Sequence, residues 1–167
     1  PEEEQNKAFP IQTEEQYQLE NTESIRQQKQ TLLVVDDDTE VAHYLKALLS
    51  PVYNVVCRFD ADSAFKAMSE EAPDLVLSDV VMPGRNGYDL CRQIKEDLQL
   101  CHIPVILVTA KATVENQVEG LNTGADAYVT KPFEPNYLLA LIKSQLKNRE
   151  KVRSLLSRST QTDEIEE

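Results

Sequence analysis

The sequence of 167 residues contains no tryptophan, only three cysteines, and no apolar run long enough to cross a bilayer. Cys57, Cys91 and Cys101 are scattered and odd in number. Their spacing indicates neither a disulfide framework nor a zinc site, so we expect reduced thiols in a cytoplasmic protein. Nothing at the start is typical of a signal peptide. Because the first residue is proline rather than methionine, we expect a fragment or a processed chain.

Positive charge and glycine are also scarce. Seventeen Lys and Arg residues against 29 Asp and Glu give a formal net charge of −12. This balance argues against attraction to nucleic acid or an anionic membrane, so we expect direct contact with neither. No glycine-rich nucleotide loop is present, and we expect no binding of ATP for self-phosphorylation. No helix-turn-helix is recognisable. Hydrophobic residues make up 41% of the chain, which suffices for the core of one ordinary domain.

Composition divides the chain into three parts. Residues 1–30 are rich in Glu and Gln and predict a polar linker or tail, with a short helix near Glu14–Gln28. Residues 31–148 have the patterns of a folded domain. Residues 149–167 predict a helical extension followed by a polar tail that is loose from about residue 157. Internal repeats are absent from the sequence.

Five strand–helix units follow one another within residues 31–148. Short apolar runs predict strands at 31–35, 53–57, 74–78, 103–109 and 126–130. Apolar residues at helical spacing follow each strand, including Leu90, Ile94 and Leu98 on the third helix, Val114, Val118 and Leu121 on the fourth, and Leu138, Leu141, Ile142 and Leu146 on the fifth. The fifth helix could run past Arg153. Alternation of this kind indicates an α/β domain of three layers, with a parallel sheet between helices.

Charged and hydroxyl side chains stand where the strands end. Asp36 and Asp37 follow the first strand, Asp79 the third, Thr109 ends the fourth, and Lys131 follows the fifth. In open parallel sheets, ligands bind outside the carboxyl ends of the strands. If the first strand lies beside the third, three carboxylates, a hydroxyl and an ammonium group converge on one edge.

Such a cluster indicates a metal-assisted phosphoryl site. Crowded carboxylates repel one another and need a cation to stay ionised. Oxygen ligands without His or Cys favour Mg²⁺ over Ca²⁺ or zinc, and Mg²⁺ tends to bridge to phosphate. Lys131, Thr109 and the backbone amide of Ala110 could bind phosphoryl oxygens. The pattern therefore predicts phosphoryl chemistry with an aspartate as the nucleophile.

The segments "LLVVDDD", "DLVLSDVVMPGRNGYDL", "IPVILVTA" and "GADAYVTKPF" together closely resemble the receiver domains of two-component response regulators. Each segment alone is modestly specific, whereas all four in this order at strand ends are highly specific. The resemblance covers residues 31–148. It implies a doubly wound, flavodoxin-like sheet of five parallel strands in the order 2-1-3-4-5.

The resemblance also implies a role for each site residue. Asp79 would accept the phosphoryl group and, with Asp37, ligate Mg²⁺ directly. Asp36 would act largely through metal-bound water, and the Val81 carbonyl would be a further protein ligand. The remaining implied roles are contacts to the phosphoryl oxygens by Thr109 and Lys131, a cis peptide bond between Lys131 and Pro132, and a switch in which the Tyr128 rotamer follows Thr109.

Structural alternatives exist for several of these residues. Asp79 alone could cap a loop, Lys131 could be a surface lysine, and Tyr128 could be half-buried packing. Asp38 is expected at a helix start, where acids are favoured, rather than on the metal. His43 is expected at the surface rather than as a phosphodonor, and the same expectation holds for His102.

The function implied is that of a phosphoacceptor receiver domain in a two-component phosphorelay, with a histidine kinase domain as donor. We expect self-dephosphorylation, a switch in the face formed by the fourth helix, fifth strand and fifth helix, and a homodimer through that face. The flanks are similar to those of receivers within hybrid sensor kinases, some followed by a DNA-binding domain, so the fragment could be the cytoplasmic part of a membrane-anchored kinase.

Two other functions are compatible with parts of the pattern. A dehalogenase-type phosphatase also uses an aspartate nucleophile, Mg²⁺, Thr and Lys. Asp36 and Asp38 fit its motif, but Glu40 stands where that motif has Thr, and the chain leaves no room for the usual cap. A degenerate receiver that serves only as a docking module is the second alternative, and the intact Asp, Thr and Lys set counts against it.

Overall fold

The structure is a computed structural model that describes residues 29–163, with side chains to residue 157. The helix predicted at Glu14–Gln28 lies outside the described residues. One parallel sheet has the order β2-β1-β3-β4-β5, which confirms the predicted flavodoxin-like fold. The strands are β1 (Thr31–Val35), β2 (Asn54–Arg58), β3 (Leu75–Ser78), β4 (Val105–Thr109) and β5 (Ala127–Thr130). The helices are α2 (Thr39–Leu49), α3 (Ala61–Glu70), α4 (Gly87–Glu96), α5 (Val114–Asn122) and α6 (Pro135–Asp163).

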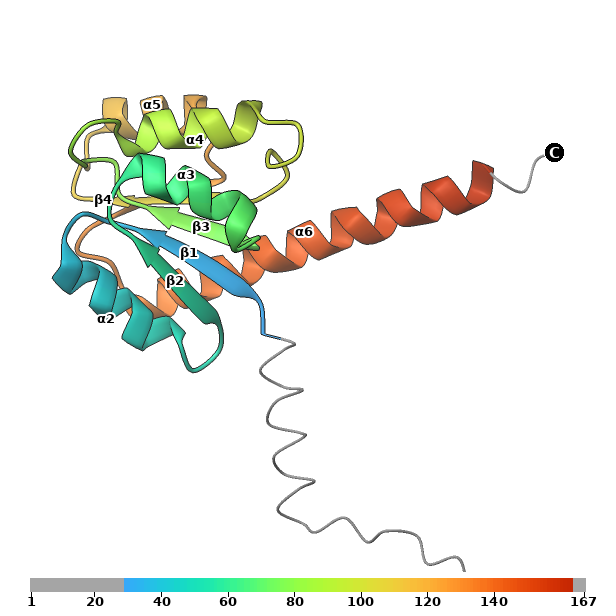
Figure 1. Cartoon of the computed structure of the whole chain (residues 1–167), viewed down its shortest axis with the longest axis horizontal. Helices are drawn as coiled ribbons and strands as arrows, with labels where there is room; N and C mark the ends of the chain where they lie inside the picture. Colours follow the sequence, from blue (N-terminus) through green and yellow to red (C-terminus); the bar gives the residue numbers. More distant parts are fainter. Residues whose placement is uncertain (1–28, 164–167) are drawn as a thin grey trace, which may run out of the picture.

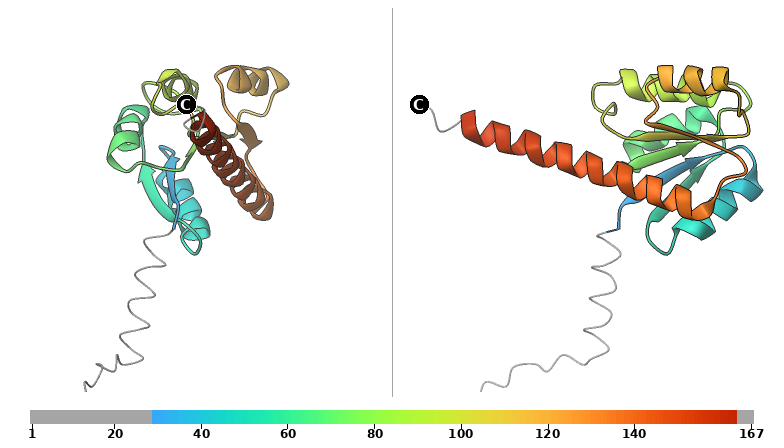
Figure 2. Two further views of the ribbon diagram at one scale, coloured as in Figure 1. Left: turned by 90° about the vertical axis from the view of Figure 1, so that its right-hand side faces the viewer. Right: turned by 180° about the vertical axis from the view of Figure 1, so that it is seen from behind.

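The helices lie on both faces of the sheet, as Figures 1 and 2 show. Successive residues of a strand point to opposite faces. In β1, Leu33 and Val35 accordingly join one buried cluster with α3 and α4, whereas Leu32 and Val34 join another with α2 and α6. Because both faces are covered, the central strands β1, β3 and β4 are apolar rather than alternating, apart from Thr31, Ser78 and Thr109 at their ends.

Each of the first four described helices begins at a capping residue. Asp38 caps α2 by accepting from the amides of the next turn, and Asp60 does the same for α3. Asn86 and Asp89 form a reciprocal capping box at α4, and Thr113 caps α5. Each cap of this kind contributes about 1 kcal/mol. Asp38 therefore has the helix-start role predicted for it.

The third predicted helix is shorter than its apolar spacing indicated. α4 ends at Glu96, and Leu98 lies beyond it with 93% of its surface exposed. The cause is Asp97, whose backbone is extended and whose side chain accepts hydrogen bonds from the amides of Gln99 and Leu100. That turn directs Leu100, rather than Leu98, toward the core.

α5 forms where predicted, but its apolar residues face outward. Val114, Val118 and Leu121 are exposed, and Gly120 is the residue of α5 that is buried. A Cβ on Gly120 would lie 2.6 Å from the ring of Tyr128. Small size, rather than apolar character, thus decides which side of this helix meets the domain.

α6 packs on the sheet through its first half and projects beyond it through its second half (Figure 1). Near the middle, Arg149 donates to the carbonyl and the carboxylate of Asp74, and that carboxylate also accepts from the amide of Thr31. The helix continues to Asp163, so the prediction of a loose tail from residue 157 is wrong up to that residue. No helix within residues 29–163 is long and apolar enough to span a membrane.

Candidate functional site

The carboxyl ends of β1, β3, β4 and β5 bring the predicted side chains to one edge of the sheet. β1 pairs directly with β3, so that Val35 lies opposite Ser78. The residues that follow, Asp36 and Asp79, are therefore neighbours. Carboxylate oxygens of Asp36, Asp37 and Asp79 lie within 4.8 Å of one another. The strand order thus produces the convergence of acids expected from the sequence.

Lys131 reaches the same cluster from the end of β5. Its Nζ lies 2.8 Å from Asp36 Oδ2 and 3.2 Å from Asp79 Oδ2. Burial lowers the pKa of Lys131, but the two carboxylates outweigh it, so the pKa is raised overall. The ammonium group is therefore charged at neutral pH. The peptide bond between Lys131 and Pro132 is cis, as predicted.

Asp36 is the most deeply buried acid of the cluster, with 2% of its surface exposed. Burial raises its pKa, although Lys131 and the Asp38 amide, which donates to Asp36 Oδ1 at 2.9 Å, lower it in part. Asp37, by contrast, is exposed at the rim of the cluster. The two adjacent acids thus differ in their surroundings, one inside and one facing solvent.

Asp79 is oriented by the loop that follows it. Its Oδ1 accepts from the amides of Val80 at 2.6 Å and Val81 at 3.3 Å, while its Oδ2 faces Lys131. Only 12% of the Asp79 side chain is exposed. The side chain of Val81 is exposed, and its backbone lies beside the carboxylate. One oxygen of Asp79 is thus fixed by the loop and the other points at a cation.

Gly87, which begins α4, makes this arrangement possible. A Cβ there would lie 2.0 Å from the Asp79 carbonyl oxygen and 2.8 Å from Val80 Cα. We expect Gly87→Ala to displace the Asp79 backbone, to lower the free energy of unfolding by about 1–3 kcal/mol and to weaken Mg²⁺ binding. Chemical denaturation and calorimetric titration would measure these effects.

Gly84→Ala is the matched control for Gly87→Ala. Gly84 has a φ of +77°, but a Cβ there would meet nothing within 4 Å. That substitution should cost only the backbone strain, about 1–2 kcal/mol, and should leave Mg²⁺ affinity unchanged. Equal losses of Mg²⁺ affinity in both variants would contradict a specific role for the space at Gly87.

Thr109 and Ala110 stand beside the cluster without a direct bond to it. Thr109 is fully buried at the end of β4, and its Oγ1 accepts from the Lys111 amide at 3.4 Å. Ala110 is exposed. Among the described residues, no hydrogen bond joins Thr109 or Ala110 to the three carboxylates. Their contact with a phosphoryl group remains a prediction.

Tyr128 links β5 to the loop after β4. Its hydroxyl donates to the Lys111 carbonyl at 2.7 Å and lies 3.4 Å from the Tyr88 hydroxyl, which bonds the Asn116 carbonyl. Burial, followed by the contact with Tyr88, raises the pKa of the Tyr128 phenol. Sequence reasoning missed Tyr88 and Gly120 as partners of Tyr128. The only local signal for Tyr88 was its position directly after Gly87.

The cluster has the properties of a site for a hard divalent ion. Among the described residues, three carboxylates meet one ammonium group, which leaves surplus negative charge among oxygen donors, and Asp37 opens the cluster to solvent. Mg²⁺ favours such oxygen ligands and retains waters of its own. Asp38, which a dehalogenase-type motif would require in the site, instead caps α2.

Comparison with known proteins agrees with the fold. The family model of the response regulator receiver domain matches residues 32–143, and the chain belongs to this family. A histidine kinase P4 from Formosa agariphila is 37% identical over 130 residues, covering 78% of this chain and 10% of that protein. The chain thus spans about a tenth of that relative's length.

Two solved structures show the same likeness. A CheY-like response regulator receiver domain protein from Methanospirillum hungatei has a TM-score of 0.69 and 34% identity, covering 74% of this chain and 98% of its own. The signal receiver domain of a signal transduction histidine kinase from Syntrophus aciditrophicus has a TM-score of 0.67 and 35% identity, covering 71% and 91%. The chain is therefore a phosphoacceptor receiver domain of two-component systems, and receiver domains as a class take their phosphoryl groups from histidine kinases.

Proposed function

We propose that Asp79 is the phosphoacceptor of this receiver domain and that a phosphohistidine of a histidine kinase domain is its donor. The observation that carries the proposal is the position of Asp79. It lies among two further carboxylates and faces the ammonium group of Lys131. An oxygen nucleophile, a place for a divalent ion and a fixed cation then share one small site.

The ion would be Mg²⁺, bound by Asp37, Asp79 and the Val81 carbonyl, with Asp36 acting largely through water. When bound, it supplies positive charge that stabilises the charge developing on the transferred group. The buried Asp36 already accepts hydrogen bonds from Lys131 and from the Asp38 amide, which fits an indirect contact with the metal through water. The exposed Asp37 fits a direct ligand.

In the proposed step, Asp79 Oδ2 attacks phosphorus in line as the phosphorus–nitrogen bond of the phosphoimidazole breaks. The freed imidazole nitrogen keeps the electron pair and takes a proton from solvent. Lys131, the Thr109 hydroxyl and the Ala110 amide contact the phosphoryl oxygens. Because Lys131 already touches Asp79 Oδ2 at 3.2 Å, it needs little movement to follow the new charge.

The output of the domain is a shift between two packing arrangements of its side chains. A phosphoryl group that draws Thr109 inward changes the space beside Tyr128, whose hydroxyl now bonds the Lys111 carbonyl. The surface of α5, β5 and α6 would change as a result, and a homodimer would form through it. The exposed Val114 and Val118 on α5 support an interaction role for this surface. Within a longer chain, the domain would serve a cytoplasmic hybrid sensor kinase.

The direct experiment is incubation with Mg²⁺ and a small phosphodonor, followed by intact-mass measurement. We expect uptake of one phosphoryl group per chain and loss of that uptake in excess EDTA. Steady hydrolysis of an aryl phosphate would instead favour the dehalogenase-type phosphatase. A chain that neither binds Mg²⁺ nor takes up phosphate would be the degenerate docking module.

Asp37→Asn should change the stability of the folded domain in opposite directions in the absence and in the presence of Mg²⁺. Without Mg²⁺, removing one of three crowded negative charges should raise the free energy of unfolding by about 1 kcal/mol. With excess Mg²⁺, the wild type should gain stability by binding, and the variant should gain far less. Thermal unfolding with and without Mg²⁺ measures both effects. Asp38→Asn is the control, because Asn also caps helices, and it should leave the Mg²⁺ response intact.

Self-hydrolysis of the aspartyl phosphate should be slow to moderate in rate, because few polar groups can orient a water molecule beside the phosphoryl group. Val81 offers no polar side chain, and the Lys111 ammonium lies 5.9 Å from the centre of the Tyr88 ring. The decay of the phosphorylated mass after removal of the donor measures the lifetime. A half-life of seconds would show that another group activates water.

A further inference from the structure

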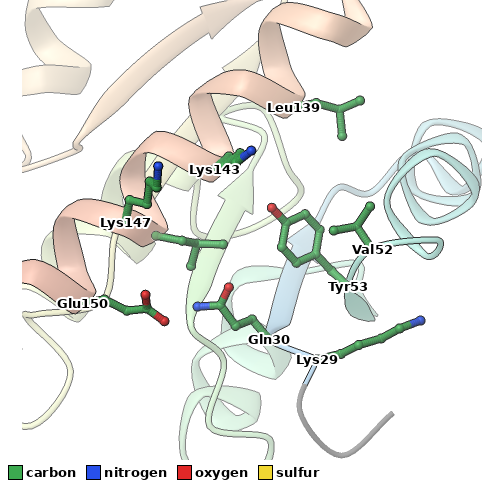
Figure 3. Close-up of a pocket in the computed structure, with 9 residues that line it drawn as sticks. Lys29, Gln30, Val52, Tyr53, Leu139, Lys143, Lys147 and Glu150 are labelled. Carbon is green, nitrogen blue, oxygen red and sulfur yellow. The ribbon is translucent and has the colours of Figure 1, made fainter. Parts of the chain in front are cut away.

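A groove lies at the opposite edge of the sheet from Asp79, where the strands begin. Residues just before β1 and β2 form one wall, and the first half of α6 forms the other (Figure 3). Its volume is about 710 Å³, and its lining is Lys29, Gln30, Val52, Tyr53, Leu139, Lys143, Leu146, Lys147 and Glu150. Because Asp36 follows β1 whereas Lys29 precedes it, the groove is separate from the phosphoryl site.

The groove combines an apolar floor with a cationic rim. Val52 is 56% exposed, so its side chain offers apolar surface for contact. Lys29, Lys143 and Lys147 also line the groove, with Glu150 as the acid in the lining. In the described part of the chain, none of these lysines forms an ion pair, and the ammonium group of Lys29 donates one long hydrogen bond, to the Ser50 carbonyl. In a protein of net charge −12, this is an unusual surface.

The sequence that precedes Lys29 has a chemistry complementary to that of the groove. Residues 1–28 contain seven glutamates against one lysine and one arginine, and Ile25 stands four positions before Lys29. Glu20 and Glu23 stand nine and six positions before Lys29 in the sequence. Since a residue spans up to about 3.4 Å, Glu23 can reach about 20 Å from Lys29. The α6 wall from Leu139 to Glu150 is about 16 Å long.

We propose that segment 14–28 of this chain occupies the groove, with Glu20 and Glu23 against Lys143 and Lys147 and Ile25 on the apolar floor. Attachment at Lys29 gives the segment an effective concentration in about the millimolar range, so that even a weak contact is populated. The docked segment joins what precedes the receiver domain to α6, the helix that leaves it. This contact is independent of the phosphotransfer proposed for Asp79.

The test is hydrogen–deuterium exchange on the full 167-residue chain, read in residues 14–28 and in the α6 wall of the groove. We expect Lys143→Glu with Lys147→Glu to speed exchange of residues 14–28 at least about threefold. Adding Glu20→Lys and Glu23→Lys should restore protection, because the charges are then exchanged rather than lost. Lys66→Glu with Lys151→Glu makes the same charge change outside the groove and should have no effect.

Two outcomes would overturn the proposal. In the first, residues 14–28 exchange at the same rate in the wild type, the double variant and the charge-exchanged variant. In the second, protection of the groove from hydrogen exchange rises with protein concentration, which would assign the groove to a second copy of the chain. The restoration step distinguishes a specific contact from a variant that simply folds poorly, because misfolding would not be reversed by lysines in the segment.

Discussion

Asp79→Asn is expected to reduce phosphoryl uptake from a small donor or a histidine kinase to background. The amide oxygen of Asn can still accept from the amides of Val80 and Val81, as Asp79 Oδ1 does, so the loop should keep its form. A neutral amide is, however, a poor nucleophile toward phosphorus, and it removes one acid from the metal cluster. The effect should therefore fall on chemistry rather than on folding.

Intact-mass measurement after incubation with donor and Mg²⁺ gives the result for Asp79→Asn directly. Asp38→Asn serves as the control, since Asp38 caps α2 outside the cluster, and it should accept phosphate normally. Uptake by Asp79→Asn at the wild-type rate would show that another residue is the acceptor. Peptide mapping of the wild-type protein would then identify that residue.

Lys131→Met should produce the largest loss of stability among the site variants. The Asp36 side chain is only 3% exposed and that of Asp79 12%, and both pair with Lys131. Removing one partner of a buried ion pair costs about 3–5 kcal/mol, because the remaining charge is left uncompensated. We also expect the phosphorylated variant to fail in switching, since no cation follows the phosphoryl group. Denaturant unfolding and amide chemical shifts of α5 measure the two effects.

The loss of stability in Lys131→Met should depend on pH. Burial already raises the pKa of Asp36, and Lys131 opposes that rise. Without Lys131, the folded state binds a proton more readily than the unfolded state, so stability should fall as pH rises through the Asp36 pKa. The variant should therefore approach the wild type in acid. A difference that is constant from acidic to neutral pH would contradict this explanation. Lys111→Met is the control, because Lys111 does not contact Asp36.

The sequence was sufficient to predict the sheet and the members of its acidic edge. Asp36, Asp79, Thr109 and Lys131 stand at the carboxyl ends of buried strands. Once the strands are parallel, few arrangements of the sheet remain possible, and these residues fall on one edge of it. Side-chain partners across the fold were harder to predict. The Tyr128 ring lies over Gly120 because α5 approaches the sheet at a glycine. No local pattern contains that long-range fit.

The errors of prediction share a physical cause, which is that helical spacing alone does not say which side of a helix is buried. Val114, Val118 and Leu121 recur as a core-facing set would, yet they are exposed on α5. Leu98 continues the spacing of α4, but the side chain of Asp97 turns the backbone first. In both places, a small or polar residue outweighs the apolar pattern.

A crystal structure of the chain with Mg²⁺ and beryllofluoride would test the central claim most directly, because beryllofluoride imitates a phosphoryl group on a carboxylate. We predict beryllofluoride on Asp79, one Mg²⁺ beside Asp37 and the Val81 carbonyl, and Lys131 and Thr109 in contact with the fluorides. Beryllofluoride or Mg²⁺ bound away from Asp79, with the three carboxylates apart, would contradict the account.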